Sequence, residues 1–184
     1  EESGRRAAAW AIERSGVPDR TELRLLAVVF DWCYPLFSDS NRARVAERMA
    51  RGVEKILPQR GLRPLSSAVL ASIALADDWP GSEQALTTAF EKRWRTELLP
   101  ALRDGRGLGP PADAVAFLEM CHPAQDNLNL DLWSQAPAFF RQFPVYLLLN
   151  YYPAPIVVEG HRFRRPAELT TAQSDPAALG ELAR

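Results

Sequence analysis

The placement of proline constrains the fold of this chain more than any other feature of its sequence. The chain has 15 prolines and 10 glycines in 184 residues, and most of the prolines stand at the ends of apolar-periodic segments. Proline lacks a backbone N–H and blocks continuation of a helix, so these prolines divide the chain into short elements. We therefore expect about seven or eight helices of modest length, joined by short turns that make neighbours antiparallel.

The clearest of these segments begins at Asp19 or Thr21, either of which can cap a helix. Apolar residues then recur at three- and four-residue steps, which places them on one helical face. The residues of that face are Leu23, Leu26, Ala27, Phe30 and Tyr34. Because this face is continuous, we expect it to be buried against the neighbouring helices.

Later segments vary in polarity. Residues 64–81 are rich in Ala and Ser and apolar nearly all round, so this helix should be buried between neighbours. Ser82 is expected to cap a longer amphipathic helix, and Pro110 or Pro111 can start another. That helix is expected to end at Cys121, where a polar connection, "HPAQDNLNLD", follows.

These patterns predict an all-α fold in which antiparallel helical hairpins stack to form an inner, apolar layer and an outer, solvent-exposed layer. A compact orthogonal bundle is the alternative packing. The segment "APIVVEGHRF", residues 154–163, is the one strand-like stretch. We interpret residues 1–184 as a single helical domain and as a part of a longer protein.

Composition excludes several classes of function. A net charge of −1 argues against a nucleic-acid-binding protein, which would carry a basic face. No apolar run approaches the roughly 20 residues of a membrane span. Cys33 and Cys121 could pair, although so low a count favours two buried thiols. Two cysteines and two histidines at wide spacing form no zinc pattern, so neither a metal nor a cofactor is predicted.

Three stretches together resemble one family. "AVVFDWCYPLFSDSNRARVAERM", "SSAVLASIALADDWPGSEQALTTAF" and "YYPAPIVVEGHRF" are similar to helical hairpins and a short extended passage in the heparinase II/III-like proteins. The resemblance implies an incomplete α/α toroid, an acidic polysaccharide or oligosaccharide as ligand, and a β-rich domain that would follow this chain. It also implies a secreted or periplasmic protein.

The chain departs from the family in two respects. The family's lyases carry an Asn-His pair on the toroid, and no Asn-His dipeptide occurs in this sequence. The connection "PQRGLRPL", residues 58–65, is also shorter than the family normally has. Both departures bear on the catalytic site that the resemblance implies.

A uronate lyase needs a group that neutralises the carboxylate, a base, and an acid for the leaving oxygen. The candidate catalytic residues are Tyr34, His122 and Tyr151. The candidate substrate-binding residues are Asn127, Asn129, Tyr152, His161 and Arg162. The predicted function is binding of an acidic polysaccharide, extended in a catalytically competent protein to its cleavage by β-elimination.

Structural roles compete with each of these assignments. Tyr34 can be a core aromatic, Asp31 can anchor a neighbouring helix through backbone N–H groups, and "FDWCY" as a whole can be a structural lock. His122, before Pro123, can stabilise a helix end through its dipole. The competing function is a non-catalytic helical scaffold or protein-interaction module. Convergence of the candidate residues on one concave pocket would favour the enzyme.

Overall fold

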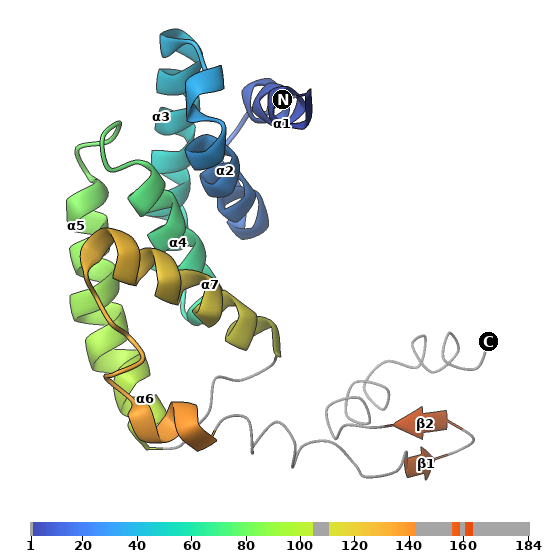
Figure 1. The fold of residues 1–184 in the computed structure, drawn as a ribbon, viewed down its shortest axis with the longest axis vertical. Coiled ribbons are helices and arrows are strands. Elements are labelled where there is room, and N and C mark those ends of the chain that lie inside the picture. The colour runs from blue at the N-terminus through green and yellow to red at the C-terminus, as the bar shows by residue number, and fades with distance from the viewer. Residues whose placement is uncertain (1, 105–110, 143–155, 159–160, 164–184) are drawn as a thin grey trace. The chain divides into compact units, whose positions relative to one another are not determined.

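The computed structural model describes residues 2–104, 111–142, 156–158 and 161–163. It confirms the predicted all-α class, since most of the described residues lie in helices that pack against one another (Figure 1). The chain divides into two compact units, Glu1–Ala136 and Pro137–Arg184. The first unit holds the helices described below.

The elements of the first unit follow one another with short connections. They are α1 (Glu2–Glu13), α2 (Arg20–Trp32), the 3-10 helix η1 (Tyr34–Leu36), α3 (Asp39–Ile56), α4 (Leu62–Ala74), α5 (Ser82–Thr87), the π-helix η2 (Thr88–Leu98), α6 (Leu99–Arg103) and α7 (Pro111–Leu128). Helices α5, η2 and α6 join without a break into one continuous rod, and α7 is a separate helix.

Helix α2 begins as the sequence predicts. The Asp19 side chain accepts a hydrogen bond of 2.8 Å from the backbone N–H of Glu22, which caps the helix. The apolar face of α2 is fully buried at Leu23, Leu26 and Phe30. Local capping and one apolar stripe are therefore enough to fix both the start and the orientation of this helix.

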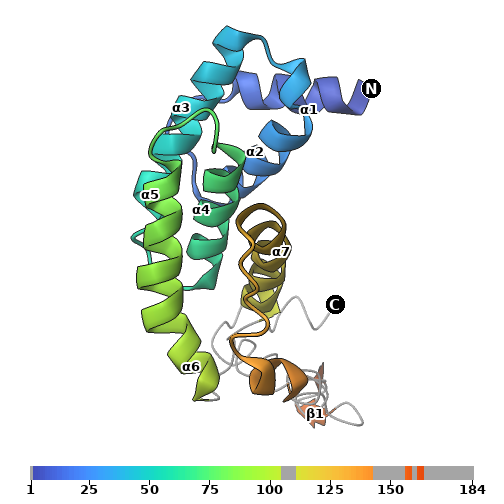
Figure 2. The ribbon, with the colours of Figure 1, turned by 60° about the vertical axis from the view of Figure 1, so that its left-hand side comes forward.

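Helix α4 is the centre of the first unit. It packs against α2, α3, α5 and α7, and Figures 1 and 2 show it surrounded by these helices. Its Ala and Ser side chains are buried on nearly every side, as expected of a helix that is apolar all round. Small side chains allow the close approach of several neighbours at once.

The predicted cap at Ser82 is wrong by one residue. Gly81 occupies the N-cap position of α5, without a side-chain cap, and Ser82 is the first helical residue. A Cβ atom at Gly81 would lie 2.6 Å from the ring of Trp79, so only glycine fits there. The close approach of Trp79, which no local pattern reveals, therefore explains the glycine at the N-cap of this helix.

The predicted end of α7 at Cys121 is also wrong. The helix begins at Pro111, as expected, but it continues through Pro123 to Leu128. An internal proline costs about 3 kcal/mol. Here Met120, Cys121 and Ala124 are completely buried, and their packing offsets that cost.

Asn129 closes α7 in a left-handed conformation with φ of 53°. Its backbone N–H donates to the carbonyl of Gln125 at 3.0 Å, which is the hydrogen bond of an αL C-cap. The "HPAQDNLNLD" stretch is thus mostly helix rather than a polar connection.

Both cysteines, Cys33 and Cys121, are buried free thiols. Burial raises the pKa of the Cys121 thiol to about 12, and the charge of Asp131 adds to this shift. No helix among the described residues combines the length and the apolar character that a bilayer-spanning helix requires.

In the second unit, residues 137–142 are helical. Two strands, β1 (Ile156–Val158) and β2 (His161–Phe163), pair antiparallel with Val157 opposite Arg162. The predicted extended segment, 154–163, therefore contains a short hairpin.

Candidate functional site

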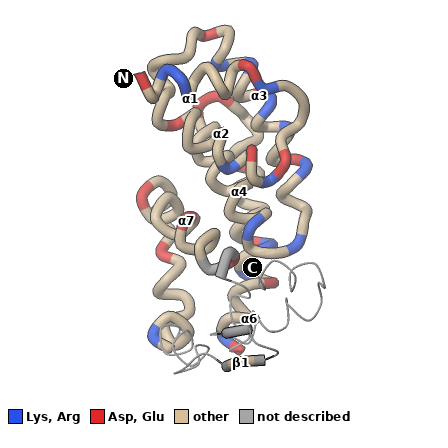
Figure 3. The backbone as a smooth tube through the Cα atoms, turned by 90° about the vertical axis from the view of Figure 1, so that its right-hand side faces the viewer, with Lys and Arg blue, Asp and Glu red and all other residues tan. Residues whose placement is uncertain are grey.

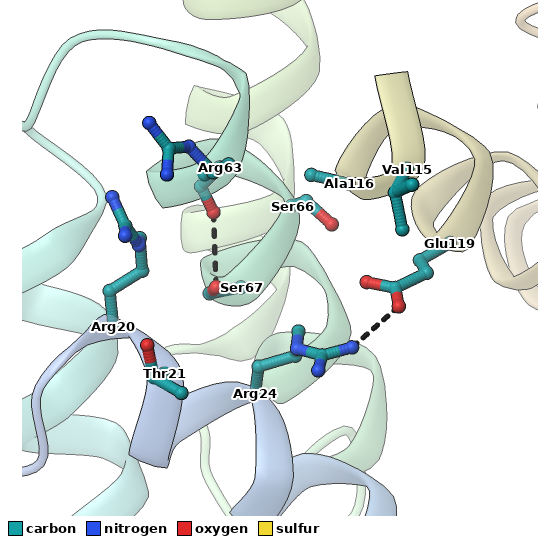
Figure 4. Close-up of a pocket in the computed structure, with 9 residues that line it drawn as sticks. All are labelled: Arg20, Thr21, Arg24, Arg63, Ser66, Ser67, Val115, Ala116 and Glu119. Carbon is teal, nitrogen blue, oxygen red and sulfur yellow. Dashed lines mark hydrogen bonds and ion pairs between the residues drawn. The ribbon is translucent and has the colours of Figure 1, made fainter. Parts of the chain in front are cut away.

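A pocket with a volume of about 380 Å³ opens where the first turns of α2 and α4 meet α7. Its lining includes Arg20, Arg24, Arg63, Ser66 and Glu119 (Figure 4). We call it the arginine pocket. Figure 4 shows Arg20 and Arg24 on α2, Arg63 on the first turn of α4, and Glu119 on α7 facing Arg24.

Two of these arginines occupy positions that oppose the helix dipole. Arg20 is the first residue of α2, and Arg63 is the second residue of α4. Basic side chains are unfavourable at a helix N-terminus, where the backbone N–H groups already give a positive potential. The N-cap of α4, Gly61, also offers its N–H groups no side-chain acceptor. The uncapped start of α4 therefore adds to the two guanidinium groups to give the pocket a positive potential, whereas the Asp19 carboxylate caps the start of α2.

Ion pairs neutralise only part of this charge. Arg24 pairs with Glu119 at 2.5 Å, and Arg63 pairs with Asp113 at 2.7 Å. Arg20 forms no ion pair with any of the described residues. The pocket therefore keeps one uncompensated positive charge at its edge, beside two pairs that are each partly exposed.

Ser66 supplies a polar group that the protein leaves unused. Its side chain is 1% exposed, and its hydroxyl has no hydrogen-bond partner among the described residues. Figure 4 shows the hydroxyl pointing into the space between α4 and α7, whereas the neighbouring Ser67 hydroxyl donates to the carbonyl of Arg63 at 3.0 Å. A buried hydroxyl without a partner costs about 1–3 kcal/mol. A ligand oxygen in the pocket would provide the missing acceptor.

A second hollow of about 320 Å³ shares Arg24 and Glu119 with the arginine pocket. We call it the apolar groove. Its remaining lining consists of Ala27, Val28, Asp31 and Trp32 on α2, Leu70, Ile73 and Ala74 on α4, and Pro123 and Asn127 on α7. Most of these side chains are aliphatic or aromatic.

The "FDWCY" stretch divides between the core and this groove. Phe30 is buried, and Trp32 is 80% exposed. Asp31 is exposed and forms no hydrogen bond or ion pair with the described residues, so the expectation that it anchors a neighbouring helix is wrong. The charge and the tryptophan of this stretch line the apolar groove instead of locking the fold.

Tyr34, a candidate catalytic residue, lies in η1 within a different set of contacts. Its ring packs edge-on against Phe30, with 5.6 Å between centroids, and the guanidinium of Arg42 lies over it at 5.0 Å. Arg42 in turn pairs with Asp78 at 3.3 Å. These contacts connect η1, α3 and the turn before α5, which is the structural role that competes with catalysis.

Partial burial raises the pKa of the Tyr34 hydroxyl above its ordinary value of 10.0. Hydrogen bonding with Asp78 and the charge of that carboxylate raise this pKa further, while Arg42 lowers it. A raised pKa keeps the phenol protonated and makes it a weaker acid, which does not favour Tyr34 as a general acid or base.

The remaining candidates lie on α7 or beyond it. His122 is exposed in the interior of α7, so it does not occupy the helix end that the sequence predicts. The Asn127 amide donates to the carbonyl of Pro123 at 3.0 Å, and Asn129 forms the helix cap. His161 and Arg162 lie in β2, and only their backbone is described. Tyr151 and Tyr152 lie outside the described residues.

The structure brings one of the candidate residues, Asn127, to the groove beside the arginine pocket. Neither hollow is lined by Tyr34 or His122. Sequence reasoning missed the residues of the arginine pocket, which are 43 positions apart at Arg20 and Arg63. One signal was present: each of these arginines directly follows a helix start, where acidic residues are the stabilising choice.

Among the described residues, no group of histidine, cysteine or carboxylate side chains could hold a metal ion. The fold and the site together define a small all-α domain with a basic pocket and an adjoining apolar groove. Comparison of the chain with protein-family models, with curated proteins and with solved structures finds no match. The resemblance to heparinase II/III-like proteins therefore stays a prediction.

Proposed function

We propose that the helical unit is an interaction module that recognises an acidic group of its partner in the arginine pocket. One observation carries the proposal: the buried Ser66 hydroxyl, which has no partner among the described residues, lines a pocket that three arginines also line. The proposed activity is recognition, which corresponds to the scaffold or interaction class that the sequence leaves open.

The geometry suits a carboxylate. Arginine donates two parallel N–H bonds to a carboxylate, and such charge-assisted bonds are about twice as strong as neutral ones. Arg20 is the guanidinium free to make them, and Ser66 can donate its O–H to the same anion. The uncapped start of α4 adds its positive potential without any movement of side chains.

The test is a titration of the full-length ¹⁵N-labelled protein with glutarate, a small dicarboxylate, at constant ionic strength. Saturable shifts confined to the amides of α2, α4 and α7 around the pocket are expected. Arg20→Gln and Arg63→Gln should each weaken binding about five- to tenfold. Arg51→Gln, which removes an exposed arginine of α3, is the matched control and should bind as the wild type does.

Two results would contradict the proposal. One is the absence of saturable shifts at any glutarate concentration that leaves the protein folded. The other is equal weakening by Arg51→Gln, because that would show a response to net charge rather than to the pocket.

Binding and cleavage of an acidic polysaccharide is the second candidate function. It is favoured by the same pocket, because a uronate carboxylate has the same charge and shape as the group proposed above. Asn127 in the adjoining groove could bind a sugar hydroxyl. Incubation with a panel of uronate polymers tests cleavage: each β-elimination creates an unsaturated uronate that absorbs in the ultraviolet. No absorbance increase with any polymer would refute the lyase.

A further inference from the structure

We infer that the partner is an amphiphilic peptide segment, with an acidic side chain in the arginine pocket and an aliphatic or aromatic side chain in the apolar groove. This inference rests on the proposed function and names the kind of partner. Three observations support it. The two hollows are continuous, an exposed tryptophan lines the apolar groove, and charged side chains lie along the edges of both hollows.

The two hollows are parts of one surface. Arg24 and Glu119 line both of them, and the ion pair between these residues is the boundary that they share. A ligand whose anionic group lies in the arginine pocket can therefore reach the apolar groove on the other side of this ion pair. The helices α2, α4 and α7 contribute side chains to both hollows, and α4 packs against the other two.

The groove offers a place for apolar side chains. Trp32 is 80% exposed at its edge, and Val28 on the preceding turn of α2 is 36% exposed. Leu70, Ile73 and Ala74 of α4 are only partly buried beneath them. Tryptophan is enriched among the residues that contribute most to binding, and a partner that covered Trp32 would remove its apolar surface from water.

Charge complementarity selects an acidic partner and its orientation. Arg20 has no carboxylate partner among the described residues, so the arginine pocket favours a negative group. Asp31 and Glu119 at the groove would repel a second negative group, so the apolar part of the partner must lie there. An amphipathic peptide has both features at a fixed spacing.

Other ligands fit the groove less well. The hydroxyls of a sugar would lose hydrogen bonds to water against the aliphatic side chains of Leu70 and Ile73, at a cost in free energy. A nucleic acid would need a basic stripe for its phosphates. Figure 3 instead shows acidic and basic residues interspersed along the described helices.

The experiment is a selection from a displayed peptide library in which one glutamate is fixed and the flanking positions are random. The full-length protein is the target. Enriched peptides are then synthesised as the parent, with the glutamate changed to glutamine, and with the apolar anchor changed to serine. We expect an aliphatic or aromatic residue at a constant spacing from the glutamate.

Variants of the protein separate the contributions of the two hollows to the binding affinity. Trp32→Ala should lower the affinity for the parent peptide about tenfold or more. It should have little effect on the affinity for the peptide with the serine anchor. Arg63→Gln should lower the affinity for the parent peptide and leave the affinity for the glutamine peptide unchanged. Val17→Ala, at an apolar residue that is 44% exposed and lines neither hollow, is the control and should change nothing.

The outcomes separate this inference from the proposed function. Enriched peptides that need Arg63 but are indifferent to Trp32 would overturn the inference and leave the anion pocket standing. Peptides that need neither Arg20 nor Arg63 would overturn both. A dimer in sedimentation that dissociates in Trp32→Ala would show that a second copy occupies the groove, and would also overturn the inference.

Discussion

Arg48 on one side of α2 and the arginines of the pocket on the other show how one residue type serves folding in one place and, in our proposal, binding in another. Arg48 of α3 is 4% exposed, and it donates to the carbonyl of Gly16 at 2.8 Å and to Glu22 at 2.6 Å. The arginines of the pocket are partly exposed, and Arg20 has no carboxylate partner among the described residues. Arg48 bonds groups of its own chain, whereas the pocket presents its charge to the solvent.

The difference lies in what surrounds each charge. A buried arginine must be bonded, because an unpaired charge in a low dielectric is strongly destabilising. Arg20 and Arg63 avoid that penalty through exposure, but they oppose the dipoles of α2 and α4. The first arrangement stabilises the fold, and the second lowers its stability slightly in return for a positive potential. Substitutions on the two sides should therefore have different consequences.

The largest effect is expected for Arg48→Met. The change leaves the Glu22 carboxylate and the Gly16 carbonyl without their donor, so the free energy of unfolding should fall by about 2–4 kcal/mol. Denaturant unfolding measures this loss. Arg51→Met, at an exposed position of the same helix, should stay within about 0.5 kcal/mol of the wild type. Equal losses in the two variants would refute the structural role of Arg48.

A second prediction concerns the buried side of α7, where the Cys121 thiol has a pKa of about 12 against an ordinary value of 9.0. The unfolded chain therefore loses this proton first as the pH rises. The contribution of the protonated thiol to the free energy of unfolding is fully present below about pH 9. Between the two pKa values, the free energy of unfolding should fall by about 1.4 kcal/mol per pH unit. Cys121→Ala should lack this contribution to the slope. Identical slopes of unfolding free energy against pH in the two proteins would contradict the burial of the thiol.

A third prediction concerns the pocket side of the same helix. Glu119→Gln removes the carboxylate that competes with a ligand for Arg24, so the affinity for glutarate should rise about three- to fivefold. Glu47→Gln removes an exposed carboxylate of α3 and should have no effect on affinity. A weaker affinity in Glu119→Gln would mean that Glu119 positions Arg24 rather than competing with the ligand.

Local chemistry predicted much of the fold. Asp19 caps α2 because its side chain reaches the N–H of Glu22, a contact within one turn that the sequence shows directly. The apolar face of α2 follows from periodicity, and the burial of α4 follows from a segment that is apolar nearly all round. The errors arose where distant residues decided the outcome: Trp79 excludes a side chain at Gly81, and the packing around Cys121 carries α7 through Pro123.

The site could not be predicted in this way. Arg20 and Arg63 meet because α2 and α4 pack side by side, and no pattern of spacing reveals that meeting. Tyr34 and His122 have side chains suited to proton transfer, but the fold places Tyr34 in a structural contact with Arg42. Among the candidates whose side chains the structure describes, Asn127 lines one of the two hollows and Tyr34 and His122 line neither. Chemical type selects candidates, whereas tertiary packing decides which of them share a pocket.

The most direct test of the central claim is Ser66→Ala, with glutarate affinity and unfolding free energy measured on the same protein. Removing a buried hydroxyl without a partner should leave stability unchanged or raise it by about 0.5–1 kcal/mol. If the hydroxyl binds the ligand, affinity should nonetheless fall about three- to tenfold. Unchanged affinity in a protein of equal or greater stability would show that Ser66 takes no part in binding, and the account of the pocket would be wrong.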